Sequence, residues 1–400
     1  MNRPPTLGVY VHWPYCARIC PYCDFNVYRH RGRTGEAAAL VDAIEADLQA
    51  QAELTGPRQL VSVFFGGGTP SLMDPDAVGR IIARAKALWS AAADLEVTLE
   101  ANPTDAEAAR FEAFAAAGVT RLSLGLQSLD DAALKFLGRD HDAAAGRRAA
   151  VAAARAFPRL SVDLIYARPG QTPAAWGDEL AAALDLGAEH ASPYQLTIET
   201  GTAFHRAVRR GRLTPPPEDL AADLYEATQA VLEAAGFDAY EVSNHARGLA
   251  ARSRHNLVYW QGEDYVGAGP GAHGRLTRGG VRRATAAVAT PAGYIARVDR
   301  SGLGFEHDDP LNPLEAAQER LLMGLRIDAG VGFAELGPLG LGPSHPRVAD
   351  LRHLGLIADD PARLRATRAG RQLLDRIAAE LAAEAAYAGA RPGADRDLKA

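Results

Sequence analysis

All three cysteines of the 400-residue sequence lie in one short segment, YCARICPYCDF, at residues 15–25. Cys16, Cys20 and Cys23 have the spacing C-x3-C-x2-C. Cysteines clustered in this way favour metal binding or catalysis over disulfide bonds, because intracellular thiols stay reduced. A [4Fe–4S] cluster normally takes four cysteines, so three would leave one iron open for another ligand.

Structural zinc is the alternative metal centre for this segment. It needs four protein ligands in a closed tetrahedron. His12 and His30 are close enough in the sequence to supply a fourth ligand, but neither belongs to a C-x2-C or H-x3-H knuckle. The iron–sulfur cluster is therefore the favoured interpretation, and analysis of bound iron and sulfide separates the two.

Six short β-like runs, each rich in Val, Leu, Ile, Phe or Tyr, must position this segment. Helical segments separate the runs, and one of them carries an apolar stripe from Leu40 to Leu48. Strands that alternate with helices predict a parallel sheet of βα units, either open or closed into a full or partial barrel. The runs lie at residues 7–12, 60–65, 95–100, 121–126, 160–166 and 192–198.

Polar or glycine residues stand at or near the carboxyl ends of these expected strands. The first strand leads into the cysteine segment, and the second ends in Gly66–Gly67–Gly68–Thr69–Pro70. Functional groups of a βα barrel gather at this face, so we expect one shared site. The polar residues on the other four strands are Glu100, Gln127, Asp163 and Gln195.

Two further parts are expected after residue 245. Residues 246–285 read as a connecting segment with HNLVYW at 255–260 and a glycine-rich stretch at 266–274 that lacks the strand–GxGxxG–helix setting of a phosphate loop. Residues 286–400 predict a smaller, mainly helical domain that resembles a winged helix. Residues 311–400 hold 12 Lys and Arg against 12 Asp and Glu, which gives no electrostatic footprint for a nucleic acid.

Charge and hydropathy narrow the class of protein. The net charge of −6 argues against a nucleic acid or an anionic membrane held by bulk electrostatics. No run of 18 apolar residues predicts a transmembrane helix, and the first residues lack the pattern of a signal peptide. We therefore expect a cytoplasmic protein without a nucleic-acid partner.

The cysteine spacing after a first strand, with Tyr22 before the last cysteine and a glycine-rich turn after the second strand, resembles the radical S-adenosylmethionine (SAM) superfamily. The resemblance implies a [4Fe–4S] cluster on Cys16, Cys20 and Cys23, with SAM on the open iron and reductive cleavage to a 5′-deoxyadenosyl radical. It also implies a partial (β/α)6 TIM-like barrel over residues 1–245.

Motifs along nearly the whole chain resemble the family that contains oxygen-independent coproporphyrinogen III dehydrogenase and the HemW-type heme chaperones. They include VYVHWPYCARICPYCDF, FFGGGTPS, LEANPTD, RLSLGLQSLD, LGRDH, SVDLIYARPGQT, PYQLTIETGT and YEVSNHA. The resemblance implies a HemN C-terminal-type domain over residues 286–400. It implies SAM contacts, by motif position, for Tyr10, Tyr22, Gly67, Gly68, Thr69, Glu100, Gln127, Arg139, Asp163 and Gln195.

Two departures separate this sequence from the dehydrogenase. Phe25 occupies the position of a fourth cysteine, and only fifteen residues precede Cys16 where the dehydrogenase carries a long N-terminal arm. HNLVYW instead resembles the H-N-x-x-Y-W signature of the chaperones. The resemblance implies heme contacts for His255, Asn256, Tyr259 and Trp260. The alternative is that His255 is a buried, hydrogen-bonded histidine and that Tyr259 and Trp260 are ordinary core aromatics.

The expected function is therefore that of a heme chaperone on a radical SAM scaffold. It would bind the cluster, SAM and heme, and pass heme to a haemoprotein acceptor such as a respiratory one. We expect it to lack coproporphyrinogen oxidase activity and to exist in a monomer–dimer equilibrium. The alternative is an oxygen-independent coproporphyrinogen III oxidase, which uses the radical to decarboxylate propionate side chains.

Overall fold

The computed structural model describes residues 4–30, 32 and 34–389. The chain divides into two compact units. Of the described residues, the first unit contains those up to 239, 243–258 and 263–309, and the second contains 240–242, 259–262 and those from 310 onward. This division differs from the boundaries expected at 245 and 285, because strands between residues 264 and 310 join the sheet of the first unit.

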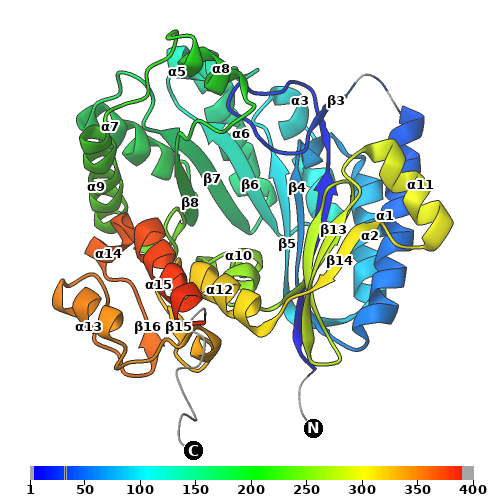
Figure 1. Ribbon diagram of the computed structural model, residues 1–400. Helices are drawn as coiled ribbons and strands as arrows, with labels where there is room; N and C mark the ends of the chain where they lie inside the picture. The colour runs from blue at the N-terminus through cyan, green and yellow to red at the C-terminus, as the bar shows by residue number, and fades with distance from the viewer. Residues whose placement is uncertain (1–3, 31, 33, 390–400) are drawn as a thin grey trace, which may run out of the picture. The chain divides into compact units, whose positions relative to one another are not determined.

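The six expected strands form the centre of the first unit. They pair in parallel in their sequence order, side by side in Figure 1. The six βα units of a partial barrel are thus confirmed. The strands are β1 (Thr6–Trp13), β4 (Gln59–Gly67), β5 (Ser90–Ala101), β6 (Arg121–Gln127), β7 (Arg159–Tyr166) and β8 (His190–Gln195).

Helices follow these strands and cover the sheet. Asp74 caps α2 through the Asp76 N–H, and the helix buries Val78, Ile81 and Ala85. The alanine-rich α6 buries a row of small side chains, and alanine has the highest helix propensity of all residues. The helices are α1 (Thr34–Thr55), α2 (Pro75–Leu88), α3 (Asp105–Ala108), α4 (Phe111–Ala116), α5 (Asp131–Phe136), α6 (Ala143–Ala156), α7 (Pro173–Leu184), α8 (Ala203–Arg209), α9 (Glu218–Ala234) and α10 (Arg254–Trp260).

The two faces of the sheet differ in polarity. On β1, Leu7, Val9 and Val11 are fully buried in the main apolar core. Successive side chains of a strand point to opposite faces, so the alternate residues of each strand line the barrel interior. That interior contains buried polar residues, one on each strand from β4 to β8. They are Ser62, Glu96, Arg121, Ser161 and His190.

The sheet continues beyond the six expected strands. Within the described residues it has twelve strands, in the order β14-β13-β12-β11-β1-β4-β5-β6-β7-β8-β10-β9. β11 pairs in parallel with β1, and an antiparallel hairpin follows it. The added elements are β9 (Asp238–Ala239), β10 (His245–Ala246), β11 (Asp264–Ala268), β12 (His273–Arg278), β13 (Val281–Ala287), α11 (Pro291–Ser301) and β14 (Phe305–Pro310).

The second unit has its own apolar core, which includes Leu321, Leu336, Leu351 and Leu381. It is mainly helical, as expected, and its two short strands β15 and β16 pair antiparallel although α13 lies between them in the sequence. The elements are α12 (Pro313–Gly324), β15 (Val331–Gly332), α13 (Pro346–His353), β16 (Arg363–Leu364), α14 (Arg368–Gln372) and α15 (Leu374–Gly389). Among the described helices of the chain, none is long and apolar enough to cross a membrane.

Candidate functional site

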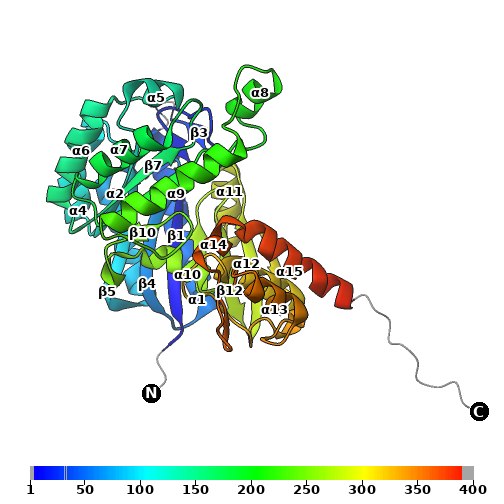
Figure 2. The ribbon, with the colours of Figure 1, turned by 90° about the vertical axis from the view of Figure 1, so that its left-hand side faces the viewer.

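The cysteine segment is a loop between two short paired strands, β2 (Tyr15–Cys16) and β3 (Tyr28–Arg29). Cys16 is buried, and Cys20 and Cys23 are half-buried, all three as free thiols. The Cys23 N–H donates to the Cys20 carbonyl at 3.2 Å. In Figure 2, α8 projects from the end of the sheet that carries this loop, and the Phe204 N–H on it donates to the Pro21 carbonyl at 3.0 Å.

Arg139 connects the cysteine loop to β6 and to the residue that follows β5. Its Nη1 lies 3.3 Å from Cys20 Sγ and 3.4 Å from the Tyr22 hydroxyl. Its Nη2 donates to Asn102 Oδ1 at 2.5 Å and to the Gly125 carbonyl at 3.3 Å. Burial raises the pKa of Cys16 and Cys23, and the charge of this guanidinium lowers the pKa of both thiols by a smaller amount. Asn102 was not singled out from the sequence, although it lies in the LEANPTD motif.

The glycine-rich turn after β4 lies directly against the strand that leads to Cys16. The Gly68 N–H donates to the Trp13 carbonyl at 2.7 Å, and the Thr69 N–H donates to the Tyr15 carbonyl at 2.9 Å. A Cβ on Gly68 would lie 2.8 Å from the Tyr15 carbonyl oxygen, so only glycine fits here. The Thr69 side chain forms a hydrogen bond with Cys16, whose thiol pKa burial raises to about 11.

Two carboxyl groups lie together on the other side of this turn. Glu100 Oε2 accepts from the Gly67 N–H at 3.2 Å, and Asp163 Oδ2 accepts from the Ser123 hydroxyl at 2.9 Å. Burial raises the pKa of Glu100 to about 8, and the charge of Asp163 adds to this shift. Burial also raises the pKa of Asp163. Such a pair favours a bound cation, since a nearby positive charge lets both groups ionise.

Replacing Glu100 with glutamine should change how stability depends on pH. The native carboxyl keeps its proton up to a pKa of about 8, whereas an unfolded glutamate loses it near pH 4.3. The native state thus binds more protons, so stability falls as pH rises between these values. In thermal or urea unfolding of cluster-free protein, the parent should lose at least about 1.4 kcal/mol relative to Glu100→Gln between pH 5 and 9, the equivalent of one pKa unit.

The control for this experiment is Glu112→Gln, which removes an exposed carboxyl on α4. It should follow the parent across the whole pH range. Parallel curves for the parent and Glu100→Gln would show that the Glu100 carboxyl is not perturbed in the folded protein.

Gln127 closes the site at the end of β6 with a backbone that is rare for its residue type. Its φ is +63°, in the left-handed region, and its side-chain Oε1 is buried without a hydrogen-bond partner. Ala167, directly after β7, has a φ of +58°. Non-glycine residues persist in this region only where the surrounding structure holds them, as it does at ligand sites.

The structure thus brings most of the expected SAM residues together. Hydrogen bonds or electrostatic contacts link Tyr10, Tyr22, Gly67, Thr69, Glu100, Arg139 and Asp163 to one another or to the cysteine loop. Gly68 and Gln127 lie against the same elements. Gln195 ends β8 with an exposed side chain and takes no part in these contacts.

Three thiols on one loop are a donor set that suits an iron–sulfur cluster. Within the described part of the chain, no group of three or more His, Cys, Asp or Glu side chains is arranged to hold one metal ion. A structural zinc site needs four ligands around one ion. A [4Fe–4S] cluster does not need such convergence, because each cysteine binds a different iron. Cys20 and Cys23 are also close enough to Cys16 to influence its pKa.

The expected heme residues lie on α10. His255 is 1% exposed, and its Nδ1 lies 2.9 Å from the Ser62 hydroxyl in the barrel interior. Asn256 Nδ2 donates to Asn244 Oδ1 at 3.4 Å. In the second unit, the Trp260 ring lies 4.8 Å from the Arg326 guanidinium. The Trp260 backbone carbonyl accepts a hydrogen bond from Arg320. Tyr259 is half-buried.

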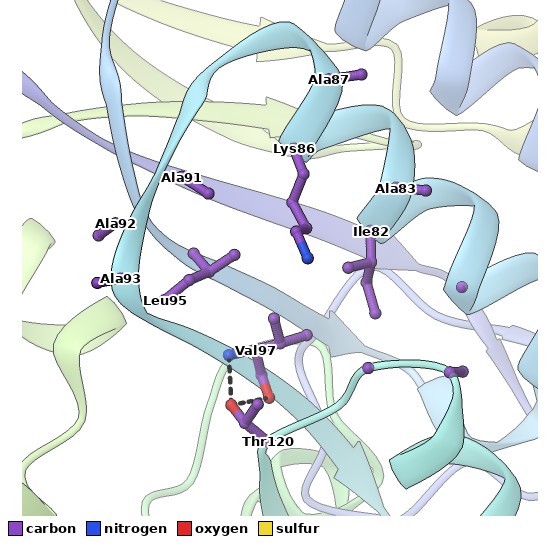
Figure 3. Close-up of a pocket in the computed structure, with 13 residues that line it drawn as sticks. Ile82, Ala83, Lys86, Ala87, Ala91, Ala92, Ala93, Leu95, Val97 and Thr120 are labelled. Atoms are coloured by element: carbon purple, nitrogen blue, oxygen red, sulfur yellow. Dashed lines mark hydrogen bonds between the residues drawn. The ribbon is translucent and has the colours of Figure 1, made fainter.

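A cavity of about 580 Å³ lies elsewhere on the first unit. Figure 3 shows Lys86 and Ile82 of α2 facing Ala91 and Leu95 at the start of β5. None of the expected site residues lines this cavity. It adjoins the amino-terminal end of β5, whereas Glu100 stands at the other end of the same strand.

Comparisons with known proteins agree with this geometry. The profile of the Radical SAM superfamily matches residues 10–183, and that of the HemN C-terminal domain matches residues 311–373. The chain is 34% identical to the Bacillus subtilis protein named heme chaperone HemW, over 92% of this chain and 96% of that protein. It is 38% identical to a Mycobacterium tuberculosis protein of the same name, over 92% and 93%.

Two further similarities complete the comparison. The chain is 42% identical to the Bos taurus protein named radical S-adenosyl methionine domain-containing protein 1, mitochondrial, over 92% of this chain and 86% of that protein. The solved structure of coproporphyrinogen III oxidase (HemN) from Escherichia coli matches with a TM-score of 0.77, over 95% of this chain and 90% of that chain. At 21% identity, this match shows the fold alone.

Proposed function

We propose a function from the premise that this chain belongs to the radical SAM family that includes the bacterial proteins named heme chaperone HemW. The proposed function is heme trafficking: the protein binds a [4Fe–4S] cluster, SAM and heme, and passes heme to an acceptor haemoprotein. The observation that carries it is similarity to those proteins over 92% of the chain, together with the assembled cysteine and carboxylate site.

The side chains of the site have distinct tasks in this proposal. Cys16, Cys20 and Cys23 hold the cluster, and Arg139 balances the negative charge of the thiolates. The Gly67–Gly68 backbone lets the methionine part of SAM approach closely, and Glu100 and Asp163 receive its positively charged or hydroxyl groups. When bound and reduced, the cluster and SAM together supply one-electron chemistry.

The alternative, a coproporphyrinogen III oxidase, is less well supported. The likeness to HemN shows only a shared fold, whereas the relatives named heme chaperone are 34–38% identical over most of the chain. Phe25, at the position of a fourth cysteine, is 62% exposed on the cysteine loop and offers no thiol. A cytoplasmic location, expected from the hydropathy of the sequence, is part of the same proposal. A respiratory acceptor and a monomer–dimer equilibrium are also parts of it.

Heme titration of the anaerobically reconstituted protein tests the proposal. Hemin should give a saturable, near-stoichiometric change in the Soret band, because a chaperone must hold its cargo specifically. Iron-free protoporphyrin serves as the matched probe, and weaker binding of it would show that the protein ligates the heme iron. The variant His255→Ala then reports whether the HNLVYW segment at residues 255–260 contributes to that complex.

The same preparation decides against the alternative. With coproporphyrinogen III, SAM and a reductant, no decarboxylated product should form. Formation of the product without specific heme binding would overturn the chaperone proposal and assign the protein to heme biosynthesis.

A further inference from the structure

Four side chains form a column through the interior of the barrel. The His255 imidazole stacks on Phe64, with ring centroids 4.9 Å apart and planes 21° apart. Tyr10 stacks on both rings, at 6.3 Å from His255 and 6.2 Å from Phe64. The Tyr10 hydroxyl then lies 2.9 Å from His12 Nδ1. The column therefore runs from α10 through β4 and β1 toward the cysteine loop.

The hydrogen bonds of His12 determine which group donates between Tyr10 and His12. His12 Nε2 lies 2.9 Å from the Asn26 carbonyl oxygen, which can only accept. Burial lowers the pKa of His12, so the ring is neutral and carries one proton. That proton must be on Nε2, which leaves Nδ1 to accept from the Tyr10 hydroxyl. Asn26 is three residues after Cys23, so the column ends on the cysteine loop.

Asn26 also fixes the loop from its other side. Its Nδ2 donates to the Pro270 carbonyl at 3.0 Å and to the Ala289 carbonyl at 2.7 Å. A Cβ on Gly271 would lie 2.5 Å from this nitrogen. The glycine-rich stretch at 266–274 therefore buttresses the loop after Cys23, which gives that stretch a structural role.

Three glycines leave the space that the column needs. A Cβ on Gly8 would lie 3.1 Å from the Ser62 hydroxyl and 3.5 Å from His255 Nδ1. A Cβ on Gly66 would lie 2.8 Å from the Phe64 ring and 3.0 Å from the Tyr10 ring. A Cβ on Gly67 would lie 2.4 Å from the His12 ring. The column thus packs directly against the glycine-rich turn as well as against the cysteine loop.

The base of the column is anchored by polar contacts. His255 Nδ1 lies 2.9 Å from the Ser62 hydroxyl, and its backbone N–H donates to Glu96 Oε1 at 3.1 Å. Glu96 also accepts from the Arg254 N–H at 3.1 Å and from Arg159 at 2.6 Å. A carboxylate at the first turn of α10 stabilises that end of the helix and holds His255 in the barrel.

We propose that His255 is a positioning residue for the cluster and SAM site: through Phe64, Tyr10 and His12 it sets the geometry of the glycine-rich turn and of the loop after Cys23. The inference rests on the cofactor part of the proposed function. It gives the H-N-x-x-Y-W segment a task in the barrel rather than a direct contact with heme iron. His255 is 1% exposed and hydrogen-bonded to Ser62, so it is placed to support the barrel interior and not to contact heme iron.

The test compares two variants of the full-length, cluster-loaded protein. His255→Ala removes the ring and leaves a cavity beneath Tyr10. The pair His255→Phe with Ser62→Ala keeps a ring for stacking, leaves no unpaired hydroxyl, and cannot ligate iron. We expect the SAM dissociation constant to rise about tenfold or more in the alanine variant and to stay within about threefold of the parent in the phenylalanine pair. The electron paramagnetic resonance change of the reduced cluster on SAM addition should follow the same order.

His245→Ala is the matched control. It removes an equally buried imidazole, on β10, whose Nε2 lies 3.2 Å from Gln229 Oε1 of α9. A general loss of stability should affect this variant as well, but its SAM affinity should stay at the parental value.

Two results would overturn the proposal. The first is unchanged SAM affinity and an unchanged spectrum in His255→Ala. The second is loss of heme binding in both His255 variants while SAM affinity stays at the parental value, which would make His255 a heme ligand. Failure of the parent itself to bind SAM or heme would instead count against the proposed function, so the two failures are distinguishable.

Discussion

Replacing Cys20 with alanine should abolish cluster binding. Only three cysteines exist in the chain, so the variant has two thiolates for a cluster that normally takes four. The Arg139 guanidinium, 3.3 Å from Cys20 Sγ in the parent, would also lose its thiolate partner on the loop. After anaerobic reconstitution, bound iron and sulfide should fall to near the background of protein that was never reconstituted. The broad absorbance of the cluster should disappear with them.

Ile19→Ala is the control for this experiment. Ile19 lies next to Cys20 on the same loop and is 37% exposed, so its truncation leaves all three ligands in place. This variant should keep the iron, the sulfide and the absorbance of the parent. Full retention of iron by Cys20→Ala would show that Cys20 is not a ligand and would remove the basis of the cluster assignment.

The barrel strands were predictable because their residues repeat a simple pattern. Helical segments separate the runs of β-branched or aromatic residues, and the parallel order then placed the ends of the strands on one face. Glu100 and the Gly66–Gly68 turn were found in this way, since Glu100 is the penultimate residue of β5 and the turn begins in the last residues of β4. The cysteine spacing is equally local, because it can be read from eight consecutive residues.

The strands between residues 264 and 287 were missed for an equally physical reason. β11 contains two glycine or alanine positions in five residues, and β13 is rich in arginine and alanine, which are poor strand formers. Their pairing with β1 and with each other stabilises them, and this is a tertiary effect. The boundary expected at 285 fell inside this added sheet.

The column beneath the site could not be predicted from sequence either. His255 follows Tyr10 by more than two hundred residues, and no periodic pattern relates them. Their stacking depends on the entry of α10 into the barrel, where Glu96 accepts from the first N–H groups of the helix. The same fact changes the interpretation of His255. An axial heme ligand must reach the iron, but this imidazole is enclosed by Gly8, Ser62 and Phe64.

Replacing Gly67 with alanine should disrupt the site more than the addition of one methyl group suggests. Gly67 has a φ of +108°, which side chains other than glycine rarely adopt, and the added Cβ would lie 2.4 Å from His12. The backbone strain and the displaced ring together should cost at least about 3 kcal/mol of unfolding free energy. SAM affinity should also fall more than about tenfold, because the Gly67 N–H would no longer meet Glu100 Oε2 and His12 would no longer hold Asn26.

The variant Gly118→Ala separates the effect of backbone strain from that of the collision with His12. Gly118 has the same φ of +108°, but a Cβ there would meet only the Ile82 side chain, at an ordinary 3.7 Å. It lines the cavity of Figure 3, at the opposite end of the β5 strand from Glu100. Urea unfolding should therefore show a smaller loss in Gly118→Ala, and SAM titration should show no loss. Only the collision with His12 distinguishes the two glycines. Equal effects of the two variants on both measurements would therefore mean that backbone strain alone explains the effect of Gly67→Ala. They would also mean that His12 does not occupy the space beneath Gly67.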